Sequence, residues 1–252
     1  MSWPTLLASA LAVAVAAAWP WPAGVDLPMG QVVDEAYRRE FAICDREDRF
    51  SGHAVHGCRD DPNAVTALRR LPGGAIAYSS KLAVDLDGSP LACSSNRGRM
   101  DQCPTSLMLP DDRGGEVPVD ADTIPYVVIP FAGPKDVQGK FTQLTSVDVG
   151  DFGYVQYHGV TVPVIVADTG PFAKLGEGSI ALHRALGREL CSERGPDKAC
   201  TQVGDDIESI SSDVVTVLFP GSARHDLTPA NLAMTISREV RRLRLNTRSA
   251  QP

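Results

Sequence analysis

The sequence lacks an excess of basic residues, and it has no charged side chain near its start. Its 24 lysines and arginines are outnumbered by 31 aspartates and glutamates, a net charge of -7, and no charged side chain precedes Asp26. A nucleic-acid-binding protein would present a basic face to the phosphate backbone. The composition therefore argues against a nucleic-acid partner and is compatible with a positively charged one.

The sequence also lacks an apolar run long enough to cross a bilayer. Residues 6–18 contain only leucine, alanine, valine and one serine, whereas a spanning helix needs about 20 apolar residues. A short apolar run that ends in small residues is typical of a secretory signal peptide. We therefore expect residues 1–23 to be a signal peptide and the mature protein to be secreted, without stable membrane insertion. An uncleaved N-terminal anchor is the alternative.

The cysteines support export. Disulfides suit an oxidising compartment, and six cysteines allow 15 pairings, of which local ones are favoured because short loops bring the partners together. A zinc site built from His53, His56 and two cysteines is the alternative, although its spacing matches no standard zinc finger. We expect three disulfides, each closing a polar loop: Cys44–Cys58, Cys93–Cys103 and Cys191–Cys200.

The apolar pattern divides the chain into a helical start and a β-rich remainder. Near-helical spacing predicts helices over 31–44 and 62–71, in an N-terminal extension that covers 24–74. Short β-rich runs separated by turn residues follow, and they predict one domain over 75–252. The predicted strands are 75–78, 82–85, 126–129, 154–157, 160–167 and 214–219, with helices over 179–186 and from Thr228 to about Arg244.

Two carboxylates stand out at the end of the strand predicted for 160–167. Asp168 follows this buried run, and Glu177 lies nine residues later between two glycines, just before a predicted helix. Glycosidic bond cleavage needs one carboxylic acid to protonate the leaving oxygen and one carboxylate to activate water or attack carbon. Structural roles are also open: Asp168 can bond turn amides, and Glu177 can lie in solvent near the helix start.

The residues around this pair resemble a known enzyme family. Residues 168–171 and 176–182 are similar to the Asp-to-Glu signature of the family 75 chitosanases, and the resemblance continues through 81–90, 105–107 and 124–130. It spans about 75–187. It implies an inverting hydrolase of β-1,4-linked glucosamine polymers that needs no cofactor and no metal, with Asp168 and Glu177 as its catalytic carboxylates.

The same segment also resembles a second group of proteins. A β-run, Asp-x-Gly-Pro-Phe and a helix with small residues recur in the double-psi β-barrels of RlpA-like proteins, which act on or bind peptidoglycan. This resemblance implies a mainly β fold, a small double-psi-type barrel with decorating helices that include a C-terminal one. A peptidoglycan-binding or peptidoglycan-cleaving protein is the alternative function, and Glu177 with its flanking glycines favours the chitosanase.

Further acidic residues near the motif are candidates for binding the cationic substrate, chitosan or a related aminosugar polysaccharide. Asp-Gly is a hairpin signal by itself, so a turn role for the first two remains open. Lys81 and His183 are weaker candidates, and a helical histidine is more often packed. We expect a monomer whose substrate-binding residues are Asp85, Asp87, Asp148, Asp151 and Tyr157.

Overall fold

The computed structural model describes residues 31–32, 49–50, 53–54, 68–93, 102–130, 140–170, 175–204 and 210–249. The predicted signal peptide, Cys44 and Cys58 lie outside these residues. Short pieces of the N-terminal region are strands: β1 (Gln31–Val32), β2 (Arg49–Phe50) and β3 (His53–Ala54).

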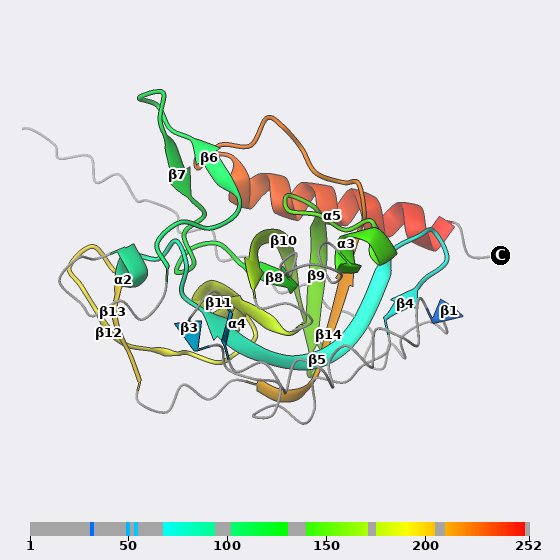
Figure 1. The fold of residues 1–252 in the computed structure, drawn as a ribbon, viewed down its shortest axis with the longest axis horizontal. Helices are drawn as coiled ribbons and strands as arrows, with labels where there is room; N and C mark the ends of the chain where they lie inside the picture. The colour runs from blue at the N-terminus through cyan, green and yellow to red at the C-terminus, as the bar shows by residue number, and fades with distance from the viewer. Residues whose placement is uncertain are drawn as a thin grey trace, which may run out of the picture.

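Six strands close into a barrel (Figure 1). β11 pairs in parallel with β5 and antiparallel with β8, β10 runs parallel to β8, and the remaining barrel pairs are antiparallel. The expected mainly β barrel with decorating helices is confirmed. Around the barrel the order is β5 (Ile76–Asp85), β11 (Glu177–Ser179), β8 (Tyr126–Pro130), β10 (Val160–Gly170), β9 (Phe152–Tyr157) and β14 (Ile210–Leu218), which pairs back with β5.

The helix predicted over 62–71 is wrong at its end. Arg69–Arg70 form strand β4, which pairs antiparallel with the start of β5. The Pro-Gly-Gly sequence after Leu71 explains this, because Gly73 and Gly74 have φ of 84° and 87° and turn the chain back on itself. β1 in turn pairs with β4, so Gln31–Val32 extend the sheet where the spacing predicted a helix.

Two helices pack against the barrel at different places. α4 (Ile180–Ala185) begins at Ser179, whose hydroxyl accepts a hydrogen bond from the Leu182 amide as an N-cap. α5 (Leu232–Ser249) crosses β10 and β9 (Figure 1). Among the described residues no helix is long and apolar enough to cross a membrane.

The smaller elements are α2 (Pro90–Cys93), α3 (Lys140–Thr145), and the hairpins β6 (Met108–Pro110) with β7 (Glu116–Pro118) and β12 (Cys191–Arg194) with β13 (Cys200–Val203).

The apolar side of α5 is buried as its sequence period predicts. Leu232, Ile236 and Val240 are buried in a cluster that also contains side chains of β8, β10 and β14. On the exposed side, the guanidinium of Arg242 donates to the Glu239 carboxylate at 2.8 Å, and that of Arg238 lies 3.4 Å from it. Arg238 and Arg242 of this helix are therefore engaged in ion pairs within the protein.

Both predicted disulfides in the described residues are present. Cys93 is bonded to Cys103, and Cys191 is bonded to Cys200. The first links α2 to the segment before β6, and the second closes the β12–β13 hairpin. Local pairing is therefore confirmed for these two loops.

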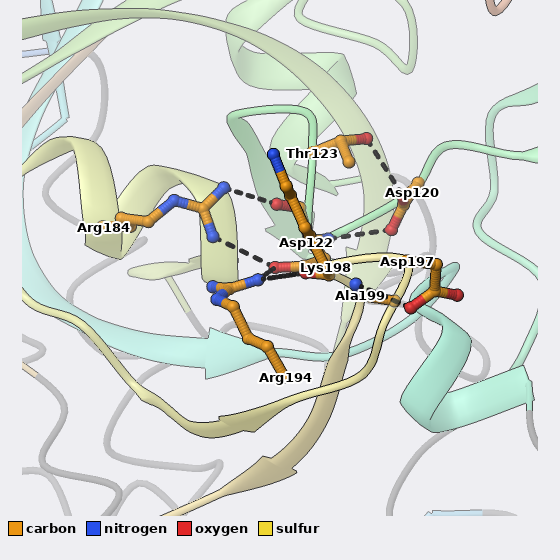
Figure 2. Close-up of a pocket in the computed structure, with 8 residues that line it drawn as sticks. All are labelled: Asp120, Asp122, Thr123, Arg184, Arg194, Asp197, Lys198 and Ala199. Atoms are coloured by element: carbon orange, nitrogen blue, oxygen red, sulfur yellow. Dashed lines mark hydrogen bonds and ion pairs between the residues drawn. The ribbon is translucent and has the colours of Figure 1, made fainter.

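A buried carboxylate joins three parts of the fold. Figure 2 shows Arg184 of α4 and Arg194 of β12 converging on Asp122, which lies just before β8. The shortest guanidinium-to-carboxylate distances are 3.0 Å for Arg184 and 3.1 Å for Arg194. A cavity of about 480 Å³ opens beside this cluster, and Asp120, Asp197 and Lys198 also line it. Because its arginines are paired with Asp122, this region ties the barrel to α4 and the hairpin.

Candidate active site

A β-bulge determines which way Asp168 points. Along β10, Val166 is opposite Val127 and Asp168 is opposite Val128, so Ala167 is an extra residue relative to β8. Regular alternation would place Ala167 and Asp168 on opposite faces of the sheet, whereas a bulge re-aims the residues after it. Asp168 consequently shares the face of Val128, which belongs to the apolar cluster that packs against α5.

Glu177 approaches the same face from the other side of β8. It pairs with Val128 on one side and with Ala83 of β5 on the other. A Cβ atom built on Gly170 would lie 2.5 Å from the Glu177 Oε2 atom and 2.9 Å from a Val128 methyl group. The Glu177 carboxyl group therefore extends over Gly170, in the space that any larger side chain would occupy.

Asp168 and Glu177 thus flank a single strand. Gly170 is two residues after Asp168 on β10. The Asp168 side chain therefore points to the side of the sheet on which the Glu177 carboxyl group lies over Gly170. Two strand spacings separate the backbones of Asp168 and Glu177, about 10 Å at about 4.8 Å per spacing. The Val128 side chain lies on the strand between them, and the Glu177 carboxyl group reaches across it to Gly170 on the strand of Asp168.

Glycine is required just before Glu177. Gly176 has φ of 86°, in the left-handed region that favours glycine, and a Cβ there would overlap the Lys81 carbonyl oxygen. The Gly176 carbonyl accepts a hydrogen bond from the Ala83 amide of β5 at 2.7 Å. The chain enters β11 through this contact, which explains why glycine precedes the candidate catalytic glutamate.

One oxygen of Asp168 accepts several hydrogen bonds. The Ser106 amide and hydroxyl donate to Oδ1 at 2.8 and 2.6 Å, and the Thr169 amide donates at 2.8 Å. Asp168 is only 5% exposed. No described residue donates a hydrogen bond to its Oδ2 atom in this way, so the two oxygens have different surroundings.

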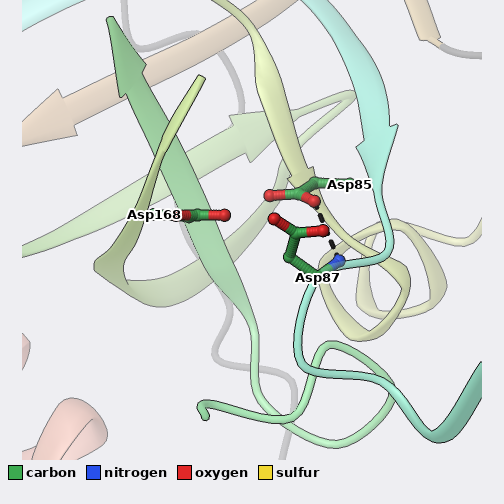
Figure 3. Close-up of side chains that lie close together, drawn as sticks. All are labelled: Asp85, Asp87 and Asp168. Atoms are coloured by element: carbon green, nitrogen blue, oxygen red, sulfur yellow. Dashed lines mark hydrogen bonds between the residues drawn. The ribbon is translucent and has the colours of Figure 1, made fainter. Parts of the chain in front are cut away.

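Two more buried aspartates lie beside Asp168. Figure 3 shows Asp85 and Asp87 with their carboxyl groups directed toward it, and one oxygen of each of the three lies within 4.8 Å of the others. The Asp87 amide donates to Asp85 at 3.0 Å, so this pair also forms the turn that its Asp-x-Asp-Gly sequence predicts. Three close carboxylates repel one another, and a cation among them would relieve that repulsion. A metal ion and an ammonium group are both cations that would relieve it.

The other two predicted acidic residues have different surroundings. Asp151 is 1% exposed, and its carboxylate accepts hydrogen bonds from the amides of Asp148, Ser222 and Ala223. Burial raises the pKa of Asp151, although these amides act in the opposite direction. Its carboxylate therefore holds together the turns before β9 and after β14. Asp148 is exposed, and its side chain caps the Val149 amide.

Tyr157 and His183 do not join the carboxylates. Tyr157 stacks on His158 at the hairpin between β9 and β10, opposite Val160. Asp168 is eight residues further along β10, roughly 25 Å at about 3.3 Å per residue. His183 is fully buried, with its ring nitrogens 3.0 and 3.1 Å from backbone carbonyl oxygens, and burial lowers its pKa. The packed interpretation of His183 is confirmed, whereas the substrate-binding role of Tyr157 stays a prediction.

Ser106 is the functional candidate that the sequence did not identify. The segment 105–107 contributed to the family resemblance, but nothing in it indicated a contact with a residue 62 positions later. Strand periodicity also could not indicate the contact, because Ser106 lies in the loop before β6. Its presence in the resembling segment was the one available signal.

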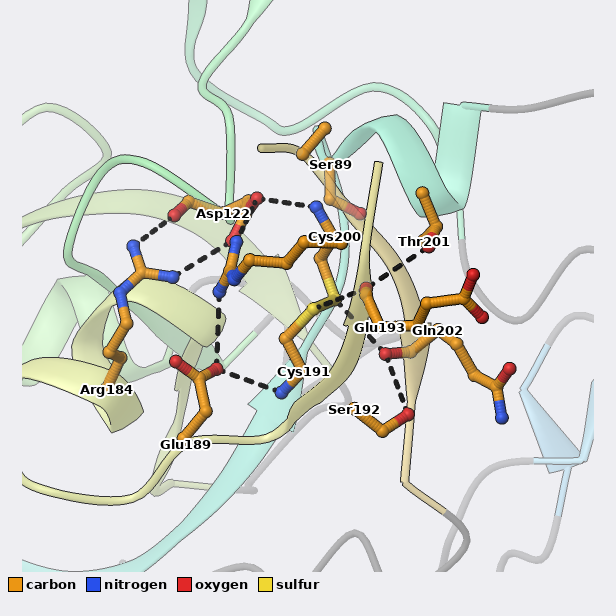
Figure 4. The surroundings of a disulfide bond; sticks show 12 residues. Ser89, Asp122, Arg184, Glu189, Cys191, Ser192, Glu193, Cys200, Thr201 and Gln202 are labelled. Atoms are coloured by element: carbon orange, nitrogen blue, oxygen red, sulfur yellow. Dashed lines mark hydrogen bonds and ion pairs between the residues drawn. A yellow bond between two sulfur atoms is a disulfide. The ribbon is translucent and has the colours of Figure 1, made fainter. Parts of the chain in front are cut away.

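The structure assigns no second catalytic centre to the cluster around Asp122. Its carboxylate accepts from both arginines and from the Cys200 amide at 2.8 Å, next to the Cys191–Cys200 disulfide (Figure 4). Arg194 also reaches Glu189 at 3.2 Å. These groups satisfy one another, which indicates a structural role.

Comparison with protein-family models found no matching family, and comparison with curated proteins found no matching sequence.

Proposed function

We propose that this chain is a glycoside hydrolase that cleaves β-1,4 bonds in chitosan or a related aminosugar polymer. The observation that carries the proposal is the placement of Asp168 and Glu177 on one face of the barrel, one on each side of Val128. Such a pair supplies the acid and the base of glycoside hydrolysis without any other group. Secretion, which we also propose, agrees with the two disulfides.

The proposed reaction is inverting, as the resemblance to the family 75 chitosanases implies. Inverting enzymes hold their carboxyl groups about 6.5–9.5 Å apart, so that a water fits between base and sugar, whereas retaining enzymes hold them about 5 Å apart. Water then attacks the anomeric carbon as the bond to the leaving oxygen breaks, and the product has the opposite anomeric configuration.

The surroundings of the two acids suggest which role each takes. Every described hydrogen bond to Asp168 is donated to Oδ1, which makes that oxygen an acceptor and leaves Oδ2 to receive the proton of the attacking water. Glu177, which is half-buried over Gly170, then gives its proton to the leaving oxygen. Asp168 is the base and Glu177 the acid in this scheme.

The buried aspartates next to Asp168 support a cationic substrate. Asp85 and Asp87 place two more carboxylates within 4.8 Å of it. Each glucosamine unit of chitosan carries an ammonium group, which would offset their repulsion and anchor the sugar at the base. N-acetylation removes that charge, so we expect chitosan to be preferred over chitin.

The test compares charge-neutral variants of the pair with a matched control. Asp168→Asn and Glu177→Gln should each lower the rate of new reducing ends from chitosan by at least about 100-fold, the usual scale of a lost acid or base. Asp112→Asn, at an exposed position in the β6–β7 turn, removes the same charge and should change nothing.

Proton NMR of the first product should show inversion. Near-normal turnover in either site variant would remove that residue from the mechanism. Activity on peptidoglycan alone, measured in the same assay, would favour the RlpA-like alternative.

A further inference from the structure

We propose that Ser106 is the positioning residue of this site, which holds Asp168 so that only Oδ2 is presented to the substrate. This inference rests on the proposed function. Ser106 does not touch the reacting atoms in this scheme. It acts through the carboxylate, to which it donates both its amide and its hydroxyl proton.

The hydroxyl groups of Thr169 and Ser106 form a hydrogen-bonded chain to Asp168, in which each group donates to the next. A serine hydroxyl donates one hydrogen bond and accepts up to two, while an ionised carboxylate only accepts. The Ser106 hydroxyl lies 2.6 Å from Asp168 Oδ1, 2.8 Å from the Thr169 hydroxyl and 3.2 Å from the Thr169 amide. Because the Ser106 proton is used on Asp168, the Thr169 hydroxyl donates to Ser106. The chain therefore runs from Thr169 through Ser106 to Oδ1.

The loop that carries Ser106 is itself held on several sides. The Leu107 amide donates to the Ala167 carbonyl at 2.8 Å, which fixes the loop to β10 at the bulge. The Thr105 hydroxyl donates to the Leu107 carbonyl at 2.7 Å and accepts from the Val119 amide at 2.9 Å. Just upstream, Cys103 is disulfide-bonded to α2. The hydroxyl is thus placed by contacts on both sides, as a positioning group requires.

The consequence for catalysis is a fixed orientation of the base. Without the hydroxyl, the Asp168 side chain loses a charge-assisted hydrogen bond, and rotation can exchange its two oxygens. A misoriented base slows the chemical step but not substrate binding, so Ser106→Ala should lower kcat roughly 10- to 100-fold. KM should stay within about twofold, since Ser106 makes no contact with the polymer in this scheme.

The fold offers a matched control for this variant. Ser222 also donates its amide to an aspartate, Asp151 Oδ1, at 2.7 Å, and its hydroxyl lies 3.4 Å from the same oxygen. Ser222→Ala removes a serine hydroxyl that lies beside a structural carboxylate but donates its proton to the Phe219 carbonyl at 2.6 Å. It should leave kcat unchanged. Ser106→Thr keeps a hydroxyl and should recover most of the activity lost in Ser106→Ala.

The experiment measures kcat and KM on chitosan from pH 4 to 8, with melting temperatures for every variant. A kcat within twofold of wild type, an equal loss in Ser222→Ala, or a change in KM alone would overturn the proposal. If Ser106→Ala does not fold, Thr169→Val is the substitute test and must also lower kcat. An unchanged kcat in Thr169→Val overturns the proposal.

A second measurement separates this inference from the proposed function. If the wild-type protein cleaves no polysaccharide, the hydrolase proposal fails. The carboxyl carbon of Asp168 can still be followed by NMR in protein labelled with carbon-13 at aspartate. At pH 7 its chemical shift should differ between Ser106→Ala and wild type and stay at the wild-type value in Ser222→Ala, and an unchanged shift in Ser106→Ala would refute the role of Ser106 by itself.

Discussion

Replacing Asp122 by asparagine should destabilise the protein substantially, whatever its activity. The Asp122 side chain is 4% exposed and bonds Arg184 at 3.0 Å, Arg194 at 3.1 Å and the Cys200 amide at 2.8 Å (Figures 2 and 4). These partners lie on α4, β12 and β13. One carboxylate therefore connects three elements to the segment before β8.

The magnitude follows from these contacts. A hydrogen bond to a charged group contributes about 1.5–3 kcal/mol, and breaking a buried ion pair costs about 3–5 kcal/mol. The side chains of Arg184 and Arg194 are 38% and 31% exposed, so water can solvate them once the charge is gone, which reduces the cost. We expect Asp122→Asn to lower the free energy of unfolding by about 2–4 kcal/mol.

The pH dependence has a definite sign. Burial acts to raise the pKa of Asp122, but the Cys200 amide, Arg184 and Arg194 outweigh it, and the net shift is downward. A carboxyl group with a lowered folded pKa contributes its full stability above the unfolded pKa, about 3.9, and loses it as pH falls further. The difference between wild type and Asp122→Asn should therefore be constant from pH 6 to 8 and shrink below about pH 4.

Urea unfolding with the disulfides intact measures this difference at each pH. Asp112→Asn, which removes an exposed carboxylate, is the control for the loss of one negative charge. A difference under about 0.5 kcal/mol at pH 7, the usual range for surface substitutions, would refute the reasoning. A difference that grows as the pH falls would contradict the assigned direction of the pKa shift.

Two further predictions concern the site. Gly170→Ala should abolish most chitosan hydrolysis, because its Cβ would lie 2.5 Å from Glu177 Oε2, whereas Gly204→Ala, with no atom within 4 Å of the new Cβ, should be active. Equal activity of these two variants would show that Glu177 is not held as described. Added salt should raise KM for chitosan but barely affect chitin, because it shortens the screening length to about 3 Å at 1 M and so weakens the long-range attraction between a cationic polymer and a protein of net charge -7. Equal salt sensitivity on both polymers would contradict the electrostatic account.

The sequence by itself determined the local elements and the identity of the candidate pair. Apolar runs of β-rich residues predicted five of the six barrel strands, with 75–78 and 82–85 joined in β5, but not the short β11. The stripe of Leu232, Ile236 and Val240 predicted the C-terminal helix, because side-chain period reports secondary structure directly. Cysteines close in sequence paired as expected in both described disulfides. The helix predicted over 62–71 failed at its end because a Pro-Gly-Gly turn favoured a hairpin over the helical period.

Only the tertiary structure decided how these pieces meet. Alternation alone directs Asp168 away from the face of Ala167, and the bulge opposite Val128 reverses that. Sequence order likewise does not reveal that β8 lies between β10 and β11, because strand order and register come from pairing between distant segments. For the same reason the sequence could not separate Asp85, which lies beside Asp168, from Asp151, which is bound by turn amides. Nor could it bring Ser106 to Asp168.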